Sequence, residues 1–313
     1  MEGFTEIEKK RKTLALVSVA AAACMAGALV FIWIRYNLEI ASVARTWFLF
    51  FVGLGAATIA NATGVGGGVV FLPAFEFLST IGIHIAAVQI VGMSFAIQCF
   101  GMSVGSLTWL NRIYREPDTA TREPPRTGVP EGQFWRIIGT ALAVNIPVML
   151  FVQRRFDAPP ENVLLWFKLF SIVLGTILAL ATLFADISEH RRMTRFDYVA
   201  IATLSVPGGI ATAFFSVGIG ELIALYLFIR NFPLVTSAAT AVIISAASVL
   251  AGVPWHLANT ELPWSILILV MPGAILGGWL ARRIAYSLGA RRLKLFASLW
   301  IVGSSLWLIW YTG

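Results

Sequence analysis

The sequence predicts an all-α polytopic membrane protein, on the evidence of its composition and of a glycine cluster that twice interrupts an apolar segment. Hydrophobic residues make up 58% of the 313 residues and charged residues only 12%, with a mean hydropathy of +0.82. A soluble domain of this size could not expose so much apolar surface. Several apolar runs are long enough to cross about 30 Å of hydrocarbon, which takes about 20 helical residues. We therefore expect a bundle of membrane-spanning helices.

The first apolar run, Leu14–Ile34, carries no charge. It is longer and less punctuated than a cleaved signal peptide, and the basic residues Lys9 to Lys12 before it suit a helix that stays in the membrane. Six further runs are expected to cross the membrane once each. They are Ile83–Leu110, Phe134–Val152, Val163–Phe184, Val235–Val253, Pro263–Ala281 and Leu293–Trp310.

Two other segments, Thr46–Gly82 and Tyr198–Arg230, do not fit a single crossing. As one helix, each would extend about 50 Å, which is too long without extreme tilt. Glycines break each segment near its middle. The clusters read Asn61-Ala-Thr-Gly-Val-Gly-Gly-Gly68 and Phe215-Ser-Val-Gly-Ile-Gly-Glu221. We expect each segment to form a re-entrant hairpin with two helical arms of about 15 residues.

The distribution of basic residues predicts the topology. If the N-terminus is cytoplasmic and each hairpin returns to its own side, most of the 23 Lys and Arg residues face the cytoplasm, as the positive-inside rule requires. The first hairpin then enters from outside and the second from inside, each followed by three transmembrane helices. This arrangement is an inverted-topology repeat, preceded by one extra N-terminal transmembrane helix. The predicted divisions are residues 1–45 for the N-terminus and first helix, 46–185 for repeat one, 186–197 for a cytoplasmic linker and 198–313 for repeat two.

These patterns predict a multi-pass membrane protein with a cytoplasmic N-terminus. The pI of about 9.8 then reflects membrane topology, and no nucleic-acid-binding motif is present. The sequence has no nucleotide-binding loop, and its three histidines are scattered, so neither a cofactor nor a metal is expected. Cys24 and Cys99 both lie in apolar runs and are expected to be buried free thiols, with a disulfide between them left open.

The two hairpin tips carry the strongest functional signal. A glycine-rich tip exposes backbone N–H donors, and the helix that leaves it presents a partly positive N-terminus. Two such tips meeting near the membrane midplane would bind a small anion without a basic side chain. The alternative is that the glycines only allow close helix packing. The candidate tip residues are Asn61, Thr63, Gly64, Gly66, Gly67, Gly68, Ser216, Gly218 and Gly220.

The helices after the tips supply a second layer of candidate substrate-binding residues. Polar residues spaced four apart share a helical face, although Ser and Thr hydroxyls also bond back to the preceding turn of their own helix. These candidates are Ser94, Gln98, Thr236, Thr240 and Ser245.

Glu221, which directly follows Gly220, is a candidate proton-coupling residue. A carboxylate beside a bound anion is repelled, and protonation would relieve that repulsion. The alternative is a carboxylate that only caps its helix.

At the two glycine clusters the chain resembles the TauE/SafE sulfite exporter family, also called the toluene sulfonate uptake permeases. Gly64-Val-Gly-Gly-Gly68 followed by Pro73 looks like the N-terminal signature of that family. Gly218-Ile-Gly220 is similar to the second signature, although Glu221 stands where glycine is common and Leu227 replaces the proline. The resemblance begins near Trp47 and covers most of the chain. It implies secondary transport of sulfur oxyanions or sulfonates, including sulfite, thiosulfate and sulfoacetate, across the bacterial inner membrane.

The residues alone favour a carrier for an anion, and the sulfur chemistry comes from the resemblance. A carrier for another small organic or inorganic anion stays an alternative, and a passive anion channel is less favoured by the broken helices. A membrane-embedded enzyme would need a His, Cys or Asp cluster at the midplane, which the sequence lacks, so no catalytic residue is predicted. The expected partners are the anionic substrate and the lipid bilayer, with a homo-oligomer left open and no nucleic acid.

Overall fold

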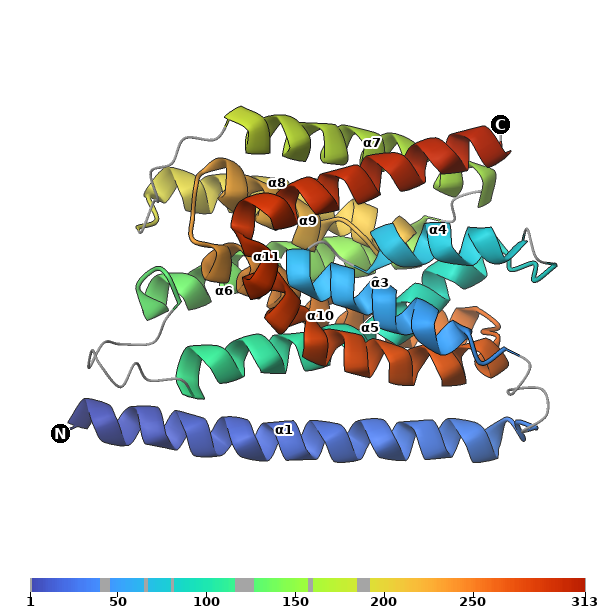
Figure 1. The fold of residues 1–313 in the computed structure, drawn as a ribbon, viewed down its shortest axis with the longest axis horizontal. Helices are drawn as coiled ribbons and strands as arrows, with labels where there is room; N and C mark the ends of the chain where they lie inside the picture. Colours follow the sequence, from blue (N-terminus) through green and yellow to red (C-terminus); the bar gives the residue numbers. More distant parts are fainter. Residues whose placement is uncertain are drawn as a thin grey trace.

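The computed structural model describes residues 2–39, 46–64, 67–79, 82–115, 127–156, 160–184 and 192–312. All the regular elements in these ranges are α-helices (Figure 1), which confirms the all-α class. In chain order they are α1 (Glu2–Arg35), α3 (Leu49–Thr63), α4 (Gly68–Ser79), α5 (Ala87–Arg115), α6 (Glu131–Arg155), α7 (Pro160–Phe184), α8 (Arg195–Phe215), α9 (Ile219–Ile229), α10 (Leu234–Asn259) and α11 (Trp264–Thr312). Gly289, with φ 72° and ψ 163°, divides α11 into two helical parts.

Among the described residues, six helices are long and apolar enough to cross a membrane, which confirms a multi-pass membrane protein. They cover Glu8–Arg35, Ala87–Tyr114, Glu131–Arg155, Arg195–Phe215, Leu234–Asn259 and Trp264–Gly289. The expected spans 163–184 and 293–310 are also helical, within α7 and the second part of α11.

The helices run between two ends of an elongated bundle, with α1 along one side (Figure 1). We call the end that holds the N-terminus the near end and the opposite one the far end. At the near end, Lys10 of α1 pairs with Glu131 at the start of α6 at 2.9 Å, and the Tyr114 hydroxyl of α5 donates to the same carboxylate at 2.6 Å. At the far end, Tyr36 after α1 stacks on Trp264 at the start of α11, with ring centroids 4.9 Å apart.

Each broken segment forms two helices, and the two pairs open at opposite ends of the bundle. We call α3 with α4 hairpin one and α8 with α9 hairpin two. Hairpin one opens at the far end, because α3 runs parallel to the first part of α11, which starts there. A Cβ built on Gly273 would lie 2.0 Å from the Phe50 carbonyl oxygen, and one on Gly277 would lie 2.4 Å from that of Leu54.

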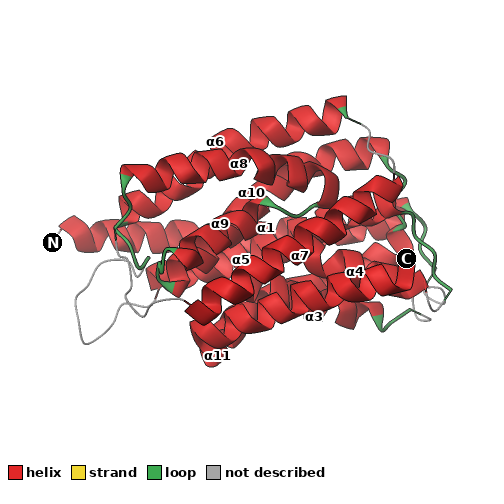
Figure 2. Ribbon diagram, turned by 90° about the horizontal axis from the view of Figure 1, so that it is seen from above, coloured by secondary structure: helices red, strands yellow, loops and turns green. Residues whose placement is uncertain are grey.

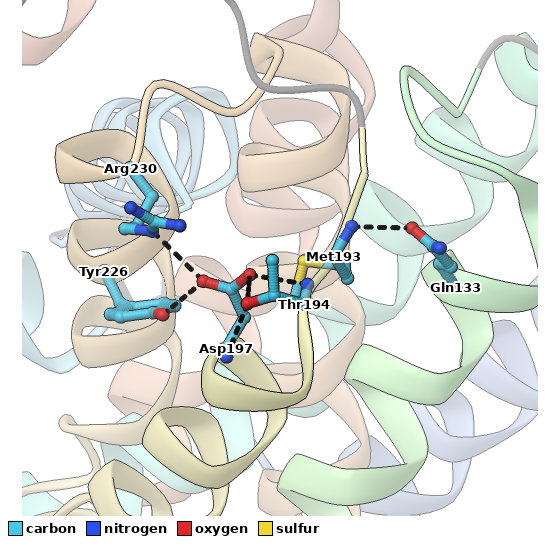
Figure 3. A network of polar contacts seen from close by, with 6 residues as sticks. All are labelled: Gln133, Met193, Thr194, Asp197, Tyr226 and Arg230. Carbon is cyan, nitrogen blue, oxygen red and sulfur yellow. Dashed lines mark hydrogen bonds and ion pairs between the residues drawn. The ribbon is translucent and has the colours of Figure 1, made fainter.

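Hairpin two opens at the near end. The base of α8 bonds to the end of α9 (Figure 3), and the Met193 N–H just before α8 donates to Gln133 at the start of α6 at 2.8 Å. The opposite orientations are what an inverted repeat requires, although the internal repeat and its boundaries stay predictions.

Three of the four arms differ in length from the expected 15 or so residues. The helices α3 and α4 have 15 and 12 residues, and α8 and α9 have 21 and 11. The helix α8 is longer than expected because Thr194 caps it at a point before the apolar run, so that Arg195 and Asp197 belong to its first turn. The helix α9 then returns the chain to the near end, so α8 is one arm of a hairpin although its length suffices for a span.

Small residues bring the first arm of each hairpin close to a neighbouring helix. A Cβ on Gly53 of α3 would lie 2.1 Å from the Val270 carbonyl oxygen of α11, and one on Gly209 of α8 would lie 3.0 Å from the Asn145 carbonyl oxygen of α6. Figure 2 shows α3 with α11 and α6 with α8 at opposite edges of the bundle. These glycines therefore serve close packing between helices.

Both cysteines are free thiols, but their burial differs from the expectation. Cys24 is exposed and Cys99 is half-buried. Cys24 is exposed because α1 lies at the side of the bundle, with only 6% of its apolar window buried by protein.

Candidate functional site

The tips of the two hairpins touch each other. A Cβ built on Gly68 would lie 2.6 Å from the Phe215 carbonyl oxygen and 2.9 Å from that of Ser216. A Cβ on Gly220 would lie 3.3 Å from the Gly64 carbonyl oxygen. Because real Cβ atoms do not approach backbone oxygens as closely as at Gly68, this contact between the tips requires glycine there.

The first arms end in the same way, with one residue in the left-handed conformation. Gly64 (φ 74°) ends α3 and its N–H bonds to the Ala60 carbonyl oxygen, while Ser216 (φ 57°) ends α8 and its N–H bonds to that of Thr212. Ser216 is therefore the structural counterpart of Gly64. Gly218 has φ 148°, a backbone conformation that favours glycine.

The side chain of Gln98 on α5 joins the two tips. Its Oε1 accepts the Gly67 N–H at 2.9 Å. Because a backbone N–H only donates, the atom that faces Gly67 must be the amide oxygen, which orients the amide nitrogen toward hairpin two. That nitrogen lies 2.7 Å from the Ser216 hydroxyl, 3.1 Å from the Ser216 carbonyl oxygen and 2.9 Å from the Ser94 hydroxyl. The structure thus brings Ser94 and Gln98 to the tips, where both are buried.

Hairpin two binds its own tip N–H groups. Glu221 Oε2 accepts the Gly218 N–H at 2.8 Å, and the Thr212 hydroxyl accepts the Ile219 N–H at 3.2 Å. The carboxylate is 2% exposed and sits in the first turn of α9, where the partial positive charge of the helix N-terminus stabilises it. This is the geometry of a helix cap, and the proton-coupling role of Glu221 stays a prediction.

A small cavity lies beside the second tip. Its volume is about 10 Å³, on the order of one water molecule. Ser245 of α10 reaches it next to Gly220, whose Cβ would lie 2.0 Å from the Ser245 hydroxyl oxygen. Glu221 is the one titratable residue in its described lining, which consists of Gln98, Thr212, Ser216, Val217, Gly218, Ile219, Gly220, Glu221, Ser245, Ser248 and Val249. An anion with several oxygens is larger than this cavity, so its entry requires the tips to separate.

Other predicted site residues are engaged within their own helices or lie elsewhere. The hydroxyls of Thr63 and Thr240 bond back to the Ile59 and Thr236 carbonyl oxygens at 2.8 and 2.6 Å, as the alternative interpretation expected. Thr236 lies in the first turn of α10 at the near end, where its hydroxyl donates to the Thr127 carbonyl oxygen at 2.6 Å. The structure does not bring Thr236 to the tips.

Asn61 faces α5, one turn before the tip. Its amide nitrogen donates to the Ala57 carbonyl oxygen at 2.8 Å, and its own carbonyl oxygen accepts the Trp109 indole N–H at 3.1 Å. Its side-chain oxygen lies against Gly105. Gly66, also a candidate, lies outside the described residues.

Two residues at the cavity were missed from the sequence, Thr212 and Ser248. Thr212 stands four residues before Ser216 on α8, and Ser248 stands three after Ser245 on α10. The same helical-face rule that selected Ser94 and Gln98 would have found both.

A polar network holds the base of hairpin two (Figure 3). Asp197, in the first turn of α8, accepts the Tyr226 hydroxyl at 2.5 Å and the Arg230 Nε at 3.1 Å. Its other oxygen accepts the backbone N–H and the hydroxyl of Thr194 at 2.7 and 2.6 Å. The Asp197 side chain is fully buried. We call this network the base clamp, because it joins the start of α8 to the end of α9.

The comparisons with known proteins identify a family. A family model described as "Sulfite exporter TauE/SafE" matches residues 49–308, which include both hairpins and the chain from α5 into the second part of α11. Comparison with curated proteins and with solved structures found no match.

Proposed function

The chain belongs to the TauE/SafE sulfite exporter family, and we propose that it is a secondary transporter for a small sulfur-containing anion in the bacterial inner membrane. The proposed substrate class is sulfite, thiosulfate, sulfoacetate or a related sulfonate. The proposed mechanism is alternating access between two inverted repeats, with the N-terminus in the cytoplasm. No catalytic step is needed for this activity.

The observation that carries the proposal is the cluster of donors between the tips. Gln98, Gly218 and the serines Ser216 and Ser245 line the cavity, and Gln98 also accepts the Gly67 N–H of hairpin one. An oxyanion accepts several hydrogen bonds at once, and a helix N-terminus favours negative charge. None of the described residues that line the cavity is basic, so backbone and amide donors would provide the binding energy.

Side-chain oxygens of the protein now accept the hydrogen bonds of these N–H groups, so a substrate anion would have to displace them. Gln98 Oε1 accepts a hydrogen bond from the Gly67 N–H, and the Glu221 carboxylate accepts one from the Gly218 N–H. An incoming anion would compete with Glu221 for the start of α9, and two negative charges so close in a low-dielectric site repel each other. Protonation of Glu221 removes the repulsion, so that a proton and an anion bind together. This coupling extends the proposal to proton-driven transport.

Uptake into proteoliposomes tests the proposed function. The full chain should accumulate sulfite, thiosulfate or sulfoacetate, and a pH gradient should drive that accumulation, whereas acetate should be transported poorly. Equal transport of acetate would favour a carrier for other small anions. Transport of none of these anions would overturn the proposal.

Glu221→Gln tests the coupling residue in the same assay. The amide keeps an oxygen for the Gly218 N–H but cannot exchange a proton. Sulfite binding should persist while accumulation driven by the pH gradient is lost. An unchanged response to the gradient would leave Glu221 as a helix cap only.

A further inference from the structure

The contact between α6 and α10 carries a line of buried polar groups outside the contacts that join the tips. The Asn145 amide nitrogen of α6 donates to the Ser248 hydroxyl of α10 at 2.7 Å. Further along, the Gln153 amide nitrogen of α6 lies 3.2 Å from Nε2 of His256 on α10. All four side chains are at most 4% exposed. A polar line this deep in a membrane protein calls for a functional explanation.

Three atoms along this line have no hydrogen-bond partner among the described residues. They are Asn145 Oδ1, Gln153 Oε1 and His256 Nδ1. A buried polar atom without a partner costs about 1–3 kcal/mol, and buried polar groups commonly bond to ordered water instead. The three atoms therefore mark places where water would bind along the line.

The line leads from the tip cavity toward the far end. Asn145, Met149 and Gln153 are spaced four apart on α6, so they share one face. Ser248, one of the residues that line the cavity with Glu221, and His256 lie on the facing side of α10. From Ser248 to His256 the helix rises about 12 Å, and His256 is within one turn of the last residue of α10.

Closely packed side chains fill the line between Ser248 and His256. They meet α10 at Gly252, midway between these two residues. A Cβ on Gly252 would lie 2.7 Å from the Phe95 ring and 3.1 Å from both the Met149 terminal methyl and the Gln153 amide nitrogen. The Phe95 and Met149 side chains are fully buried, and the Phe95 ring packs on His256 with centroids 4.4 Å apart. Met149 is the flexible member, because its unbranched side chain adopts many shapes.

We propose that this line is a water-filled proton path between the far end and the tip cavity, gated by Met149. His256 receives a proton from water at one ring nitrogen and releases one from the other, so that the ring keeps its charge. Phe95, Gln153 and Trp255 contact the imidazole, and Gly92 of α5 lies beside its Nδ1. None of these four residues has a titratable side chain. The proton then reaches Glu221 in the cavity. The coupling role rests on the proposed function, whereas the path itself does not.

Proton leak in the absence of substrate tests the path directly. The full chain is reconstituted in vesicles with a pH-sensitive dye inside, and a membrane potential that draws protons inward is imposed with a potassium gradient and valinomycin. Met149→Ala removes the gate and should raise the rate of proton entry about tenfold over wild type. Met149→Leu keeps the volume and should not leak. Met271→Ala, an equally buried methionine on α11, controls for general loosening of the core. A leak from Met149→Ala no larger than that from Met271→Ala would overturn the path.

His256→Gln tests the relay with sulfite present. The amide can hydrogen-bond to Gln153 but cannot pass a proton between two ring nitrogens. Proton movement that accompanies sulfite should fall about tenfold while sulfite binding stays as in wild type. Unchanged sulfite-linked proton movement would overturn the role of His256. Absence of sulfite transport in the wild-type chain would count against the proposed function, and the substrate-free leak of Met149→Ala would still decide the path.

Discussion

Hairpin one and hairpin two hold their tip N–H groups by different means. In hairpin one the Gly67 N–H bonds to Gln98, a side chain of the separate helix α5. In hairpin two the Gly218 and Ile219 N–H groups bond to Glu221 and Thr212, which belong to the hairpin itself. The first tip is therefore completed by a neighbouring helix, and the second tip is complete by itself. Gln98 also ties the second tip to the first through its contacts with Ser216.

The helices that follow the hairpins differ at one matched position. Gln98 and Ser245 stand at the same distance from the starts of α5 and α10, at Ala87 and Leu234, and each lies against a tip glycine. The glutamine reaches across to hairpin two, whereas the shorter serine does not bridge. The cavity accordingly lies at the second tip, where the side chain is short.

Breaking the base clamp should have the largest effect on stability. Asp197→Ala leaves the Tyr226 hydroxyl and the Arg230 guanidinium without their buried acceptor, at a cost of about 3 kcal/mol. Thermal unfolding of the purified full chain in detergent measures the loss. Glu8→Ala, which removes an exposed ion pair with Lys12 at 2.9 Å, should leave the unfolding temperature nearly unchanged, because solvent screens such pairs. Equal effects of the two variants would contradict the role of the clamp.

Gln98→Leu should have the next largest effect, because it removes the side chain that completes the tip of hairpin one. The variant leaves the buried Gly67 N–H without its acceptor, which costs about 1–3 kcal/mol, and it disconnects the tips. Transport of sulfite into proteoliposomes should fall about tenfold or more. Met102→Leu, one turn further along α5, is the control and should transport normally. Normal transport by Gln98→Leu would show that the tips need no bridge.

Gly220→Ala tests the contact between the tip of hairpin two and Ser245 of α10. Its Cβ would lie 2.0 Å from the Ser245 hydroxyl oxygen, so the single variant should lose stability by about 1–3 kcal/mol through overpacking. Adding Ser245→Gly removes the clashing side chain and should restore part of that loss, measured as a double-mutant cycle on thermal unfolding. Additive losses would mean that the two residues do not meet.

Thr236→Val should have the smallest effect on function. Thr236 bonds to Thr127 at the near end and lies away from the tips. Sulfite transport and sulfite affinity should stay within about twofold of wild type, apart from a loss of about 1 kcal/mol in stability for the missing hydrogen bond. A specific loss of sulfite affinity would return Thr236 to the site that the sequence pattern assigned to it.

The sequence predicted the helical class and the two broken segments because hydropathy and helix-breaking glycines act locally. It did not predict the length of α8, because the Thr194 cap lies outside the apolar run. It selected Gln98 and Ser245, which the structure brings to the tips, because both follow the tips on apolar helices. The same rule also selected Thr236, which lies away from the tips. Spacing along one helix does not reveal how far a residue lies from a tip that belongs to a different hairpin.

The polar pairs of α6 and α10 show the limit of such patterns most clearly. Asn145 and Gln153 are far in sequence from Ser248 and His256, and each is an isolated polar residue in an apolar run. Their significance appears only when the two helices are packed together. Similarly, the base clamp joins Asp197 of α8 to Tyr226 and Arg230 at the end of α9. The sequence pattern did not predict how the two arms of the hairpin pack together.

If both tips bind one anion, as we propose, variants at either tip should lower the affinity of the chain for sulfite. Binding of radiolabelled sulfite to the purified full chain should be compared for wild type, Gln98→Leu and Ser245→Val, with Thr236→Val as the control. Because one anion would contact donors at both tips, each of the first two variants should weaken sulfite binding about tenfold or more, equivalent to about 1.4 kcal/mol. Sulfite affinity unchanged in either variant would contradict a shared site.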